Sequence, residues 1–155
     1  MDDLLRWLGA ILDAEEEQAR AATPGPWWHN PGKQWLGPDA FEKYDLRQGE
    51  EFVGYGGPHP FTGAVASTGP ASNMQGMKDA AFIAAHDPAR VLQETEAKRG
   101  IVARYEFACG EAAVLGISEE ERETRVQVAG ALQSCVLCFA AIYADRPGYR
   151  EEWRP

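Results

Sequence analysis

The chain has 155 residues, and its hydrophobic content of 45% is enough for one domain with a core that needs no disulfide or metal. Its formal net charge of −9 excludes a general nucleic-acid binder, because such proteins neutralise phosphates with a positive surface. The acidic start, Met1-Asp2-Asp3, is unlike a secretory signal, and no unbroken apolar run reaches the ~18 residues that cross a bilayer. The three cysteines, an odd number, favour reduced thiols. We therefore expect a cytoplasmic protein without membrane contact.

Residues 1–22 are predicted to form the first helix of a single α+β domain that spans residues 1–155. Leu4, Leu8 and Leu12 recur at a spacing of four, which places them on one face of a helix. The helix must end at Thr23-Pro24-Gly25-Pro26, because the prolines fix φ and lack the backbone donor that a helix needs.

Residues 23–76 have a different composition, in which glycine and proline alternate with aromatic side chains. Turn-forming residues between aromatic ones are typical of short strands joined by tight turns. We expect a small antiparallel sheet, with candidate strands at Trp27–His29, Gln34–Leu36, Glu51–Tyr55 and Ala64–Ser67.

Residues 77–144 are predicted to form three helices that pack on this sheet, at Lys78–His86, Pro88–Cys109 and Ser118–Tyr143. Asp87 and Pro88 have the chemistry of an N-cap followed by a first helical residue. Ser118 and Glu121 match a capping box, in which each side chain satisfies a backbone donor at the start of a helix.

The last predicted helix carries an apolar seam suited to another helix. Its spacings alternate between four and three, through Val128, Leu132, Cys135, Phe139 and Ile142. The Cys135-Val-Leu-Cys138 pair lies within this pattern, away from a helix N-terminus and without a second pair, so we predict core packing rather than zinc or redox chemistry. No metal or other cofactor is expected.

The tail, residues 145–155, alternates arginine with aromatic side chains, a pattern typical of contact surfaces. It can dock on its own domain, join a second subunit or hold an anionic ligand. The candidate interface residues from the last helix and the tail are Val128, Leu132, Phe139, Arg150 and Trp153.

A candidate ligand site lies among the aromatic residues of the predicted sheet. Aromatic rings there can stack on a flat ligand, an arginine can neutralise a phosphate, and the two histidines can be ligands or ordinary loop residues. The candidates are Trp27, Trp28, His29, Trp35, Arg47, Tyr55 and His59.

Two segments resemble an uncharacterised family, a domain of unknown function found in actinobacteria such as Streptomyces and in their phages. HDPARVLQETEAKRGIV (86–102) and YADRPGYREEWRP (143–155) carry this resemblance, whereas ATPGPW (22–27) and DAAFIAAHDP (79–88) are similar to a looser set of small phage and prophage proteins. The resemblance covers about half of the chain and implies a bacterial or phage accessory protein. It supplies no catalytic residues.

Three functional hypotheses follow from these residues. The first is a non-catalytic accessory protein that binds a small anionic ligand, such as a nucleotide acting as an immune signal. The second is a protein–protein interaction module, either a homo-oligomer or a partner of a host protein. The third and least supported is a metal-dependent enzyme, which needs His29 or His59 beside Asp39, Asp45 or a metal; no serine lies in a nucleophile elbow.

Overall fold

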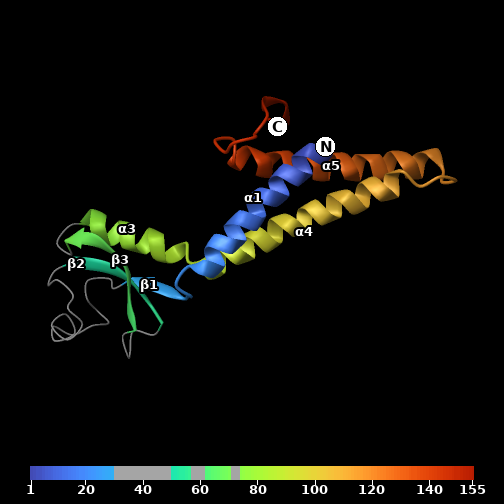
Figure 1. Ribbon diagram of the computed structural model, residues 1–155. Coiled ribbons are helices and arrows are strands. Elements are labelled where there is room, and N and C mark those ends of the chain that lie inside the picture. Colours follow the sequence, from blue (N-terminus) through green and yellow to red (C-terminus); the bar gives the residue numbers. More distant parts are fainter. Residues whose placement is uncertain (30–49, 57–61, 71–73) are drawn as a thin grey trace. The chain divides into compact units, whose positions relative to one another are not determined.

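The computed structural model describes residues 1–29, 50–56, 62–70 and 74–155, which fall into two compact units (Figure 1). One unit comprises Met1–Glu15 and Glu94–Pro155, and the other comprises Glu16–Gln93. An N-terminal helix, a three-stranded antiparallel sheet and further helices confirm the α+β class. The predicted single domain over residues 1–155 stays a prediction.

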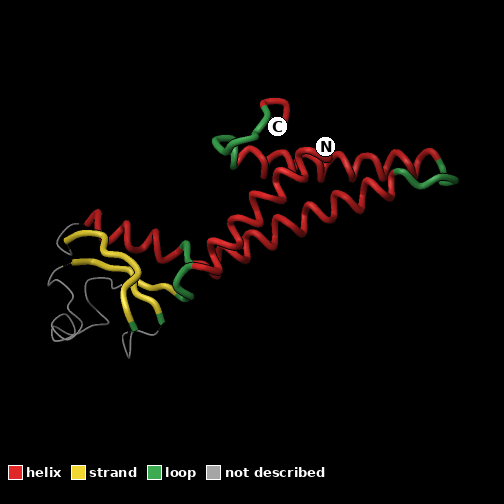
Figure 2. The backbone as a smooth tube through the Cα atoms, viewed as in Figure 1, coloured by secondary structure: helices red, strands yellow, loops and turns green. Residues whose placement is uncertain are grey.

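The sheet of the second unit has three strands in the order β1-β2-β3, each antiparallel to its neighbour (Figure 2). The strands are β1 (Trp27–His29), β2 (Glu50–Tyr55) and β3 (Gly63–Pro70). Three of the predicted strands are therefore confirmed, and the fourth candidate, Gln34–Leu36, lies outside the described residues.

Helix α3 (Met74–Ala85) lies against this sheet. Ala80 is fully buried, and the Thr68 hydroxyl of β3 donates a hydrogen bond of 2.8 Å to the Gly76 carbonyl oxygen. The helix begins four residues before the predicted start at Lys78. This tertiary hydrogen bond holds the first turn at Gly76, a residue that by itself favours turns.

The junction between α3 and α4 (Pro88–Ala112) has the predicted capping chemistry. The Asp87 carboxylate accepts a 2.9 Å hydrogen bond from the Arg90 backbone N–H, which satisfies one free donor of the first turn. His86 Nδ1 lies 2.7 Å from the Phe82 carbonyl oxygen, so the histidine closes the end of α3. Asp87 is therefore the N-cap that the sequence predicts.

The helical unit is built from the first part of α1 (Asp2–Ala21), the greater part of α4, and α5 (Glu119–Ile142). Its core joins all three helices, through Leu4, Leu8, Leu12, Tyr105, Val136, Ala140, Tyr143 and Trp153. The three leucines are at most 1% exposed, as their spacing predicts. Helix α3 lies against the sheet, whereas α5 belongs to this separate core. The structure therefore differs from the expectation that all three later helices pack on the sheet.

The C-terminal tail docks on α1 of the same unit. Trp153, in the short helix η2 (Glu151–Trp153), is 6% exposed, and its ring centroid lies 5.2 Å from that of Trp7. The Trp7 indole N–H donates a 2.9 Å hydrogen bond to the Pro147 carbonyl oxygen. Arg150 forms an ion pair of 3.1 Å with Asp3, which anchors the tail to the first turn of α1.

Candidate protein-interaction surface

Helices α4 and α5 form a hairpin whose end is set by local capping (Figure 1). Ser118 is the N-cap of α5, and its hydroxyl oxygen accepts a 3.2 Å hydrogen bond from the Glu121 backbone N–H. The first half of the predicted capping box is therefore present. The Glu121 carboxylate, however, binds Arg125 at 2.8 Å, because the guanidinium one turn later offers a charged partner.

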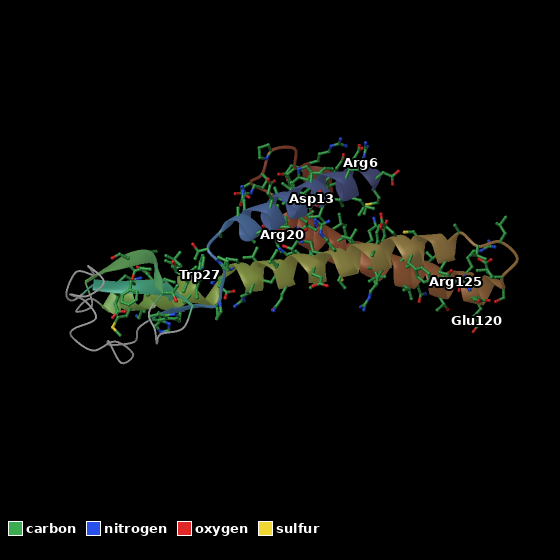
Figure 3. The ribbon with its side chains drawn as sticks, turned by 60° about the horizontal axis from the view of Figure 1, so that its bottom comes forward. Arg6, Asp13, Arg20, Trp27, Glu120 and Arg125 are labelled. Atoms are coloured by element: carbon green, nitrogen blue, oxygen red, sulfur yellow. The ribbon has the colours of Figure 1, made fainter. Side chains whose placement is uncertain are left out.

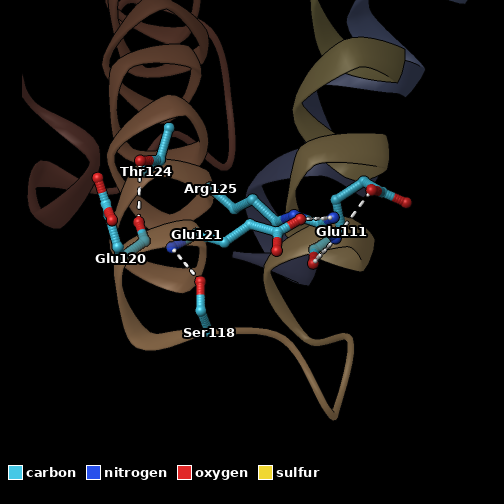
Figure 4. A network of polar contacts seen from close by, with 6 residues as sticks. All are labelled: Glu111, Ser118, Glu120, Glu121, Thr124 and Arg125. Atoms are coloured by element: carbon cyan, nitrogen blue, oxygen red, sulfur yellow. Dashed lines mark hydrogen bonds and ion pairs between the residues drawn. The ribbon is translucent and has the colours of Figure 1, made fainter.

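Arg125 connects the two helices of the hairpin (Figure 4). One guanidinium nitrogen donates to both the backbone carbonyl and the carboxylate of Glu111, each at 3.0 Å, while the other binds Glu121. The Glu111 carbonyl lies in the last turn of α4, where carbonyls lack helical partners and attract positive charge. This network fixes the spacing of α4 and α5 near the hairpin loop.

A groove of about 350 Å³ runs between α4 and α5 directly beside this network. Its walls come from both helices and are mostly apolar, with charged groups at the edges: Arg104, Phe107, Ala108, Glu111, Thr124, Arg125, Val128 and Leu132. Phe107 is 71% exposed and Val128 is 50% exposed. Burying a large apolar side chain contributes about 1.5–3 kcal/mol, so a partner that covered these residues would gain binding energy from them.

The exposed part of α5 carries no charge over most of the helix. Six of the seven residues in Glu119–Arg125 are charged, whereas none of the 17 residues in Val126–Ile142 is. Within α5, only Val136 and Ala140 are buried in the unit. An uncharged helix is normally covered on all sides, so α5 has more apolar surface than its own unit covers.

By length and composition, α5 is the one described helix that could cross a membrane, which differs from the sequence-based expectation. The apolar residues are interrupted by Gln127, Gln133 and Ser134 and therefore do not form an unbroken run. Helices of this length and composition also occur in the cores of proteins that do not cross a membrane.

The predicted core packing of the cysteine pair is wrong. Cys135 and Cys138 are both exposed, as are Val128 and Ile142 of the predicted seam. The buried side of α5 is centred on Val136 and Ala140 instead. Since one residue corresponds to about 100° of helix rotation, the packing against α1 and α4 leaves most of the predicted seam at the surface.

The other predicted interface residues fall into two groups. Leu132 lines the groove and Phe139 is half-buried against the core. Trp153 is buried by its own unit, and Arg150 pairs with Asp3 and lies 5.2 Å from the Trp153 ring. Part of the predicted interface is therefore already covered by the chain itself, whereas Val128 and Leu132 remain accessible. Their role in an interface stays a prediction.

The described candidates for a ligand site lie on the sheet. The Trp28 ring is 8% exposed, lies edge-on to Phe52 with centroids 5.7 Å apart, and covers Gly54, where an added Cβ would come within 2.6 Å of the ring. The half-buried Trp27 donates its indole N–H to the Thr23 carbonyl at 2.9 Å. Trp28 is thus part of the packing between β1 and β2.

The remaining ligand-site candidates are only partly described. His29 and Tyr55 are half-buried at the ends of β1 and β2, while Trp35, Arg47 and His59 lie outside the described residues. The same holds for Asp39 and Asp45, the acidic residues considered for an enzyme. Within the described ranges, no three His, Cys, Asp or Glu side chains are placed to hold a metal ion.

A polar trio lies inside the helical unit. The Tyr143 hydroxyl donates to the Glu15 carboxylate at 2.7 Å and accepts from the Lys98 ammonium at 2.5 Å. Burial, and then the Glu15 carboxylate, raise the pKa of Tyr143 well above its usual range, so this phenol stays protonated further into the alkaline range. Because the trio joins α5, α1 and α4, its role is to align the three helices.

Sequence reasoning missed Phe107 and the charged edges of the groove. Phe107 lies two residues after the buried Tyr105, so the two side chains cannot share one face of α4, and this spacing was a usable signal. The absence of charge from Val126 to Ile142 was another. The link between Arg125 and Glu111 depends on the pairing of two helices and has no signal in the sequence.

The fold and the exposed hairpin describe an α+β protein with an incompletely covered helical unit. A family model described as a family of unknown function, DUF6221, matches residues 1–155. The chain belongs to this family. No curated protein and no solved structure matches the chain.

Proposed function

We propose that this chain is a non-catalytic protein–protein interaction module that uses the α4–α5 face of its helical unit. The observation that carries the proposal is the uncharged, exposed surface of α5 beside the groove that holds Phe107 and Val128. Apolar groups surrounded by charged ones are typical of docking surfaces. Here Arg104 and Glu111 supply the charged edge.

The test is a comparison of co-purified proteins between two matched variants. Val128→Glu places a charge in the groove, whereas Ala14→Glu places the same charge at an exposed position of α1 in the same unit. The wild type and Ala14→Glu should each retain a protein in stoichiometric amount, and this protein can be a second, differently tagged copy of the chain. Val128→Glu should lose the retained protein. Identical retention by all three proteins, or no stoichiometric protein with the wild type, would contradict the proposal.

Small-ligand binding on the sheet is the second proposal. Its support is the half-buried pair Trp27 and Tyr55, which are partners in the register of β1 and β2. Aromatic side chains on one face of these two strands can stack on a flat ring. It ranks second because Trp28, the third described aromatic candidate, is occupied by packing on Gly54, and the Tyr55 ring lies against Gly63. A thermal-shift screen with cyclic and linear nucleotides tests it, and a nucleotide that binds will raise the melting temperature.

The setting that we propose is a cytoplasmic accessory protein of actinobacterial or phage type. Its support is the resemblance carried by residues 86–102 and 143–155. Fractionation of the native cell tests the compartment. An accessory protein of this kind appears in the soluble fraction, and recovery with the membranes would count against it.

A further inference from the structure

Helix α5 carries a continuous exposed stripe on the side facing away from its core. The stripe recurs at spacings of four and three, through Glu123, Gln127, Ala131, Ser134, Cys138 and Ile142, all of which are exposed. Its centre consists of small side chains, which allow another helix to approach closely. Val128 and Cys135 flank the stripe and are also exposed.

The uncharged part of the stripe, from Gln127 to Ile142, is symmetric about a point between Ser134 and Cys135. Reversing the helix about this point brings Ala131 onto Cys138 and Gln127 onto Ile142. It also brings Glu123, before the uncharged stretch, toward the far end of α5, where Arg146 lies in the turn four residues beyond Ile142. A surface that maps onto itself in this way suits a two-fold dimer, where both subunits offer the same patch.

Glu123 in the second turn of α5 and Arg146 just past its end carry opposite charges, with Asp145 directly before Arg146. Among the described residues, the carboxylates of Glu120 and Glu123 and the guanidinium of Arg146 form no ion pair. Neighbouring charges are paired within the chain, for example Glu121 with Arg125 and Arg150 with Asp3. An antiparallel partner would bring an acidic end beside each free arginine, and the opposed helix dipoles favour the same arrangement.

The charges of α4 argue against a lipid bilayer as the occupant. Arg99, Arg104 and Glu106 lie along α4, the other helix of the hairpin. A bilayer that enclosed α5 would also take in these side chains, and each charge at its centre costs about 2.5–3.5 kcal/mol or more. A protein surface covers α5 without this penalty.

We propose that the surface covering α5 is α5 of a second copy of this chain, packed antiparallel about a two-fold axis at Ser134 and Cys135. Small residues bring the helices together, Val128 extends the apolar contact beside the stripe, and Glu123 meets Arg146 of the other copy at each end. This inference rests on the proposed interaction function and names its partner.

The first test is the mass of the full-length protein by light scattering across a concentration series in reducing buffer. Twice the chain mass of 17.0 kDa is expected for the wild type and for the control Ala14→Glu. Ala131→Glu puts the same charge at the centre of the stripe and should give the single-chain mass, with an unchanged circular dichroism spectrum. A wild type that stays at the single-chain mass, or an Ala131→Glu protein as dimeric as Ala14→Glu, would overturn the proposal.

The second test addresses the antiparallel direction and keeps the proposal testable if Ala131→Glu does not fold. Glu123→Arg and Arg146→Glu alone should each raise the dimer dissociation constant on the order of tenfold, since two exposed pairs are affected. The double reversal should restore it to near the wild-type value. A double variant as weak as the single variants would rule out this register.

The two proposals fail in different ways. A monomeric wild type that loses a stoichiometric foreign protein through Val128→Glu overturns the dimer and leaves the interaction function in place. A wild type that binds neither itself nor another protein overturns both.

Discussion

Helices α1 and α5 contribute to the same core but differ in what their other faces offer. In α1 the leucine stripe is buried, and the exposed face carries charged side chains such as Arg6 and Asp13 (Figure 3). In α5 the charges are confined to the first two turns, near Glu120 and Arg125, and the remaining exposed face is neutral. The exposed face of α1 is suited to water, whereas the exposed face of α5 is the one that we propose to bind a further protein surface.

The polar contacts show the same difference. Asp13 of α1 forms an ion pair with Arg99 of α4, and Arg20 forms one with Glu16. Past Arg125, the Ser134 hydroxyl on the exposed face of α5 donates a hydrogen bond to the Gly130 carbonyl oxygen, within the helix itself. The charged groups on the exposed face of α1 are therefore satisfied by water and ion pairs. The exposed face of α5 is suited to contact with another apolar surface.

The largest expected effect tests whether the tail belongs to the core. Trp153→Ala should lower the free energy of unfolding by about 3–5 kcal/mol, because it removes a buried indole packed on Trp7. The loss should be independent of protein concentration, as measured by urea unfolding. A loss that grows with protein concentration would instead place Trp153 between subunits.

The next largest expected effect comes from truncating a buried side chain of α1, compared with an exposed side chain of α5. Leu8→Ala in α1 should cost about 2–5 kcal/mol, since Leu8 is fully buried. Val126→Ala in α5, at a 54% exposed position away from the stripe, should change stability by less than about 0.5 kcal/mol. Urea unfolding of both variants provides the measurement. Equal losses would show that the assignment of buried and exposed faces is wrong.

The pH dependence tests the tyrosines that join the helices. Burial raises the pKa of Tyr105 to about 12, with a further contribution from Cys109, and the pKa of Tyr143 is raised in the same direction. An unfolded tyrosine titrates near 10. Each phenol therefore stabilises the fold fully below about pH 10 and loses this contribution as the pH rises through the pKa of the folded state.

The wild-type free energy of unfolding should accordingly fall between about pH 10 and 12, on the order of 2 kcal/mol for one group. Tyr105→Phe and Tyr143→Phe should each show a smaller fall, even if their stability at pH 7 is lower. The measurement is urea unfolding at a series of pH values. Variants that follow the wild-type slope would mean that these phenols titrate normally.

Much of the fold was predictable because local chemistry determines it. The prolines after Ala22, the Asp87 cap and the Ser118 cap act within a few residues, and the helices begin or end there as predicted. The strands at Trp27–His29 and Glu50–Tyr55 agree with the prediction to within one residue. Each of these signals can be read without knowing the tertiary partner.

The candidate surface was predictable only in part. The sequence identified Val128 and Leu132, but it placed Cys135 and Cys138 in the core and overlooked Phe107. Which side of an uncharged helix is buried depends on the helices that pack against it, and here α1 and α4 select Val136 and Ala140. A helix without charged positions gives no internal signal that distinguishes its two faces.

The most direct test of the central claim is the reactivity of the α5 thiols. Cys135 and Cys138 are exposed within one chain, and Cys109 on α4 is half-buried. If α5 is covered by a protein surface, alkylation of Cys138, followed by mass spectrometry, will be slow at high protein concentration and fast after dilution or in Ala131→Glu. Equally fast alkylation at every concentration and in both proteins would contradict the account.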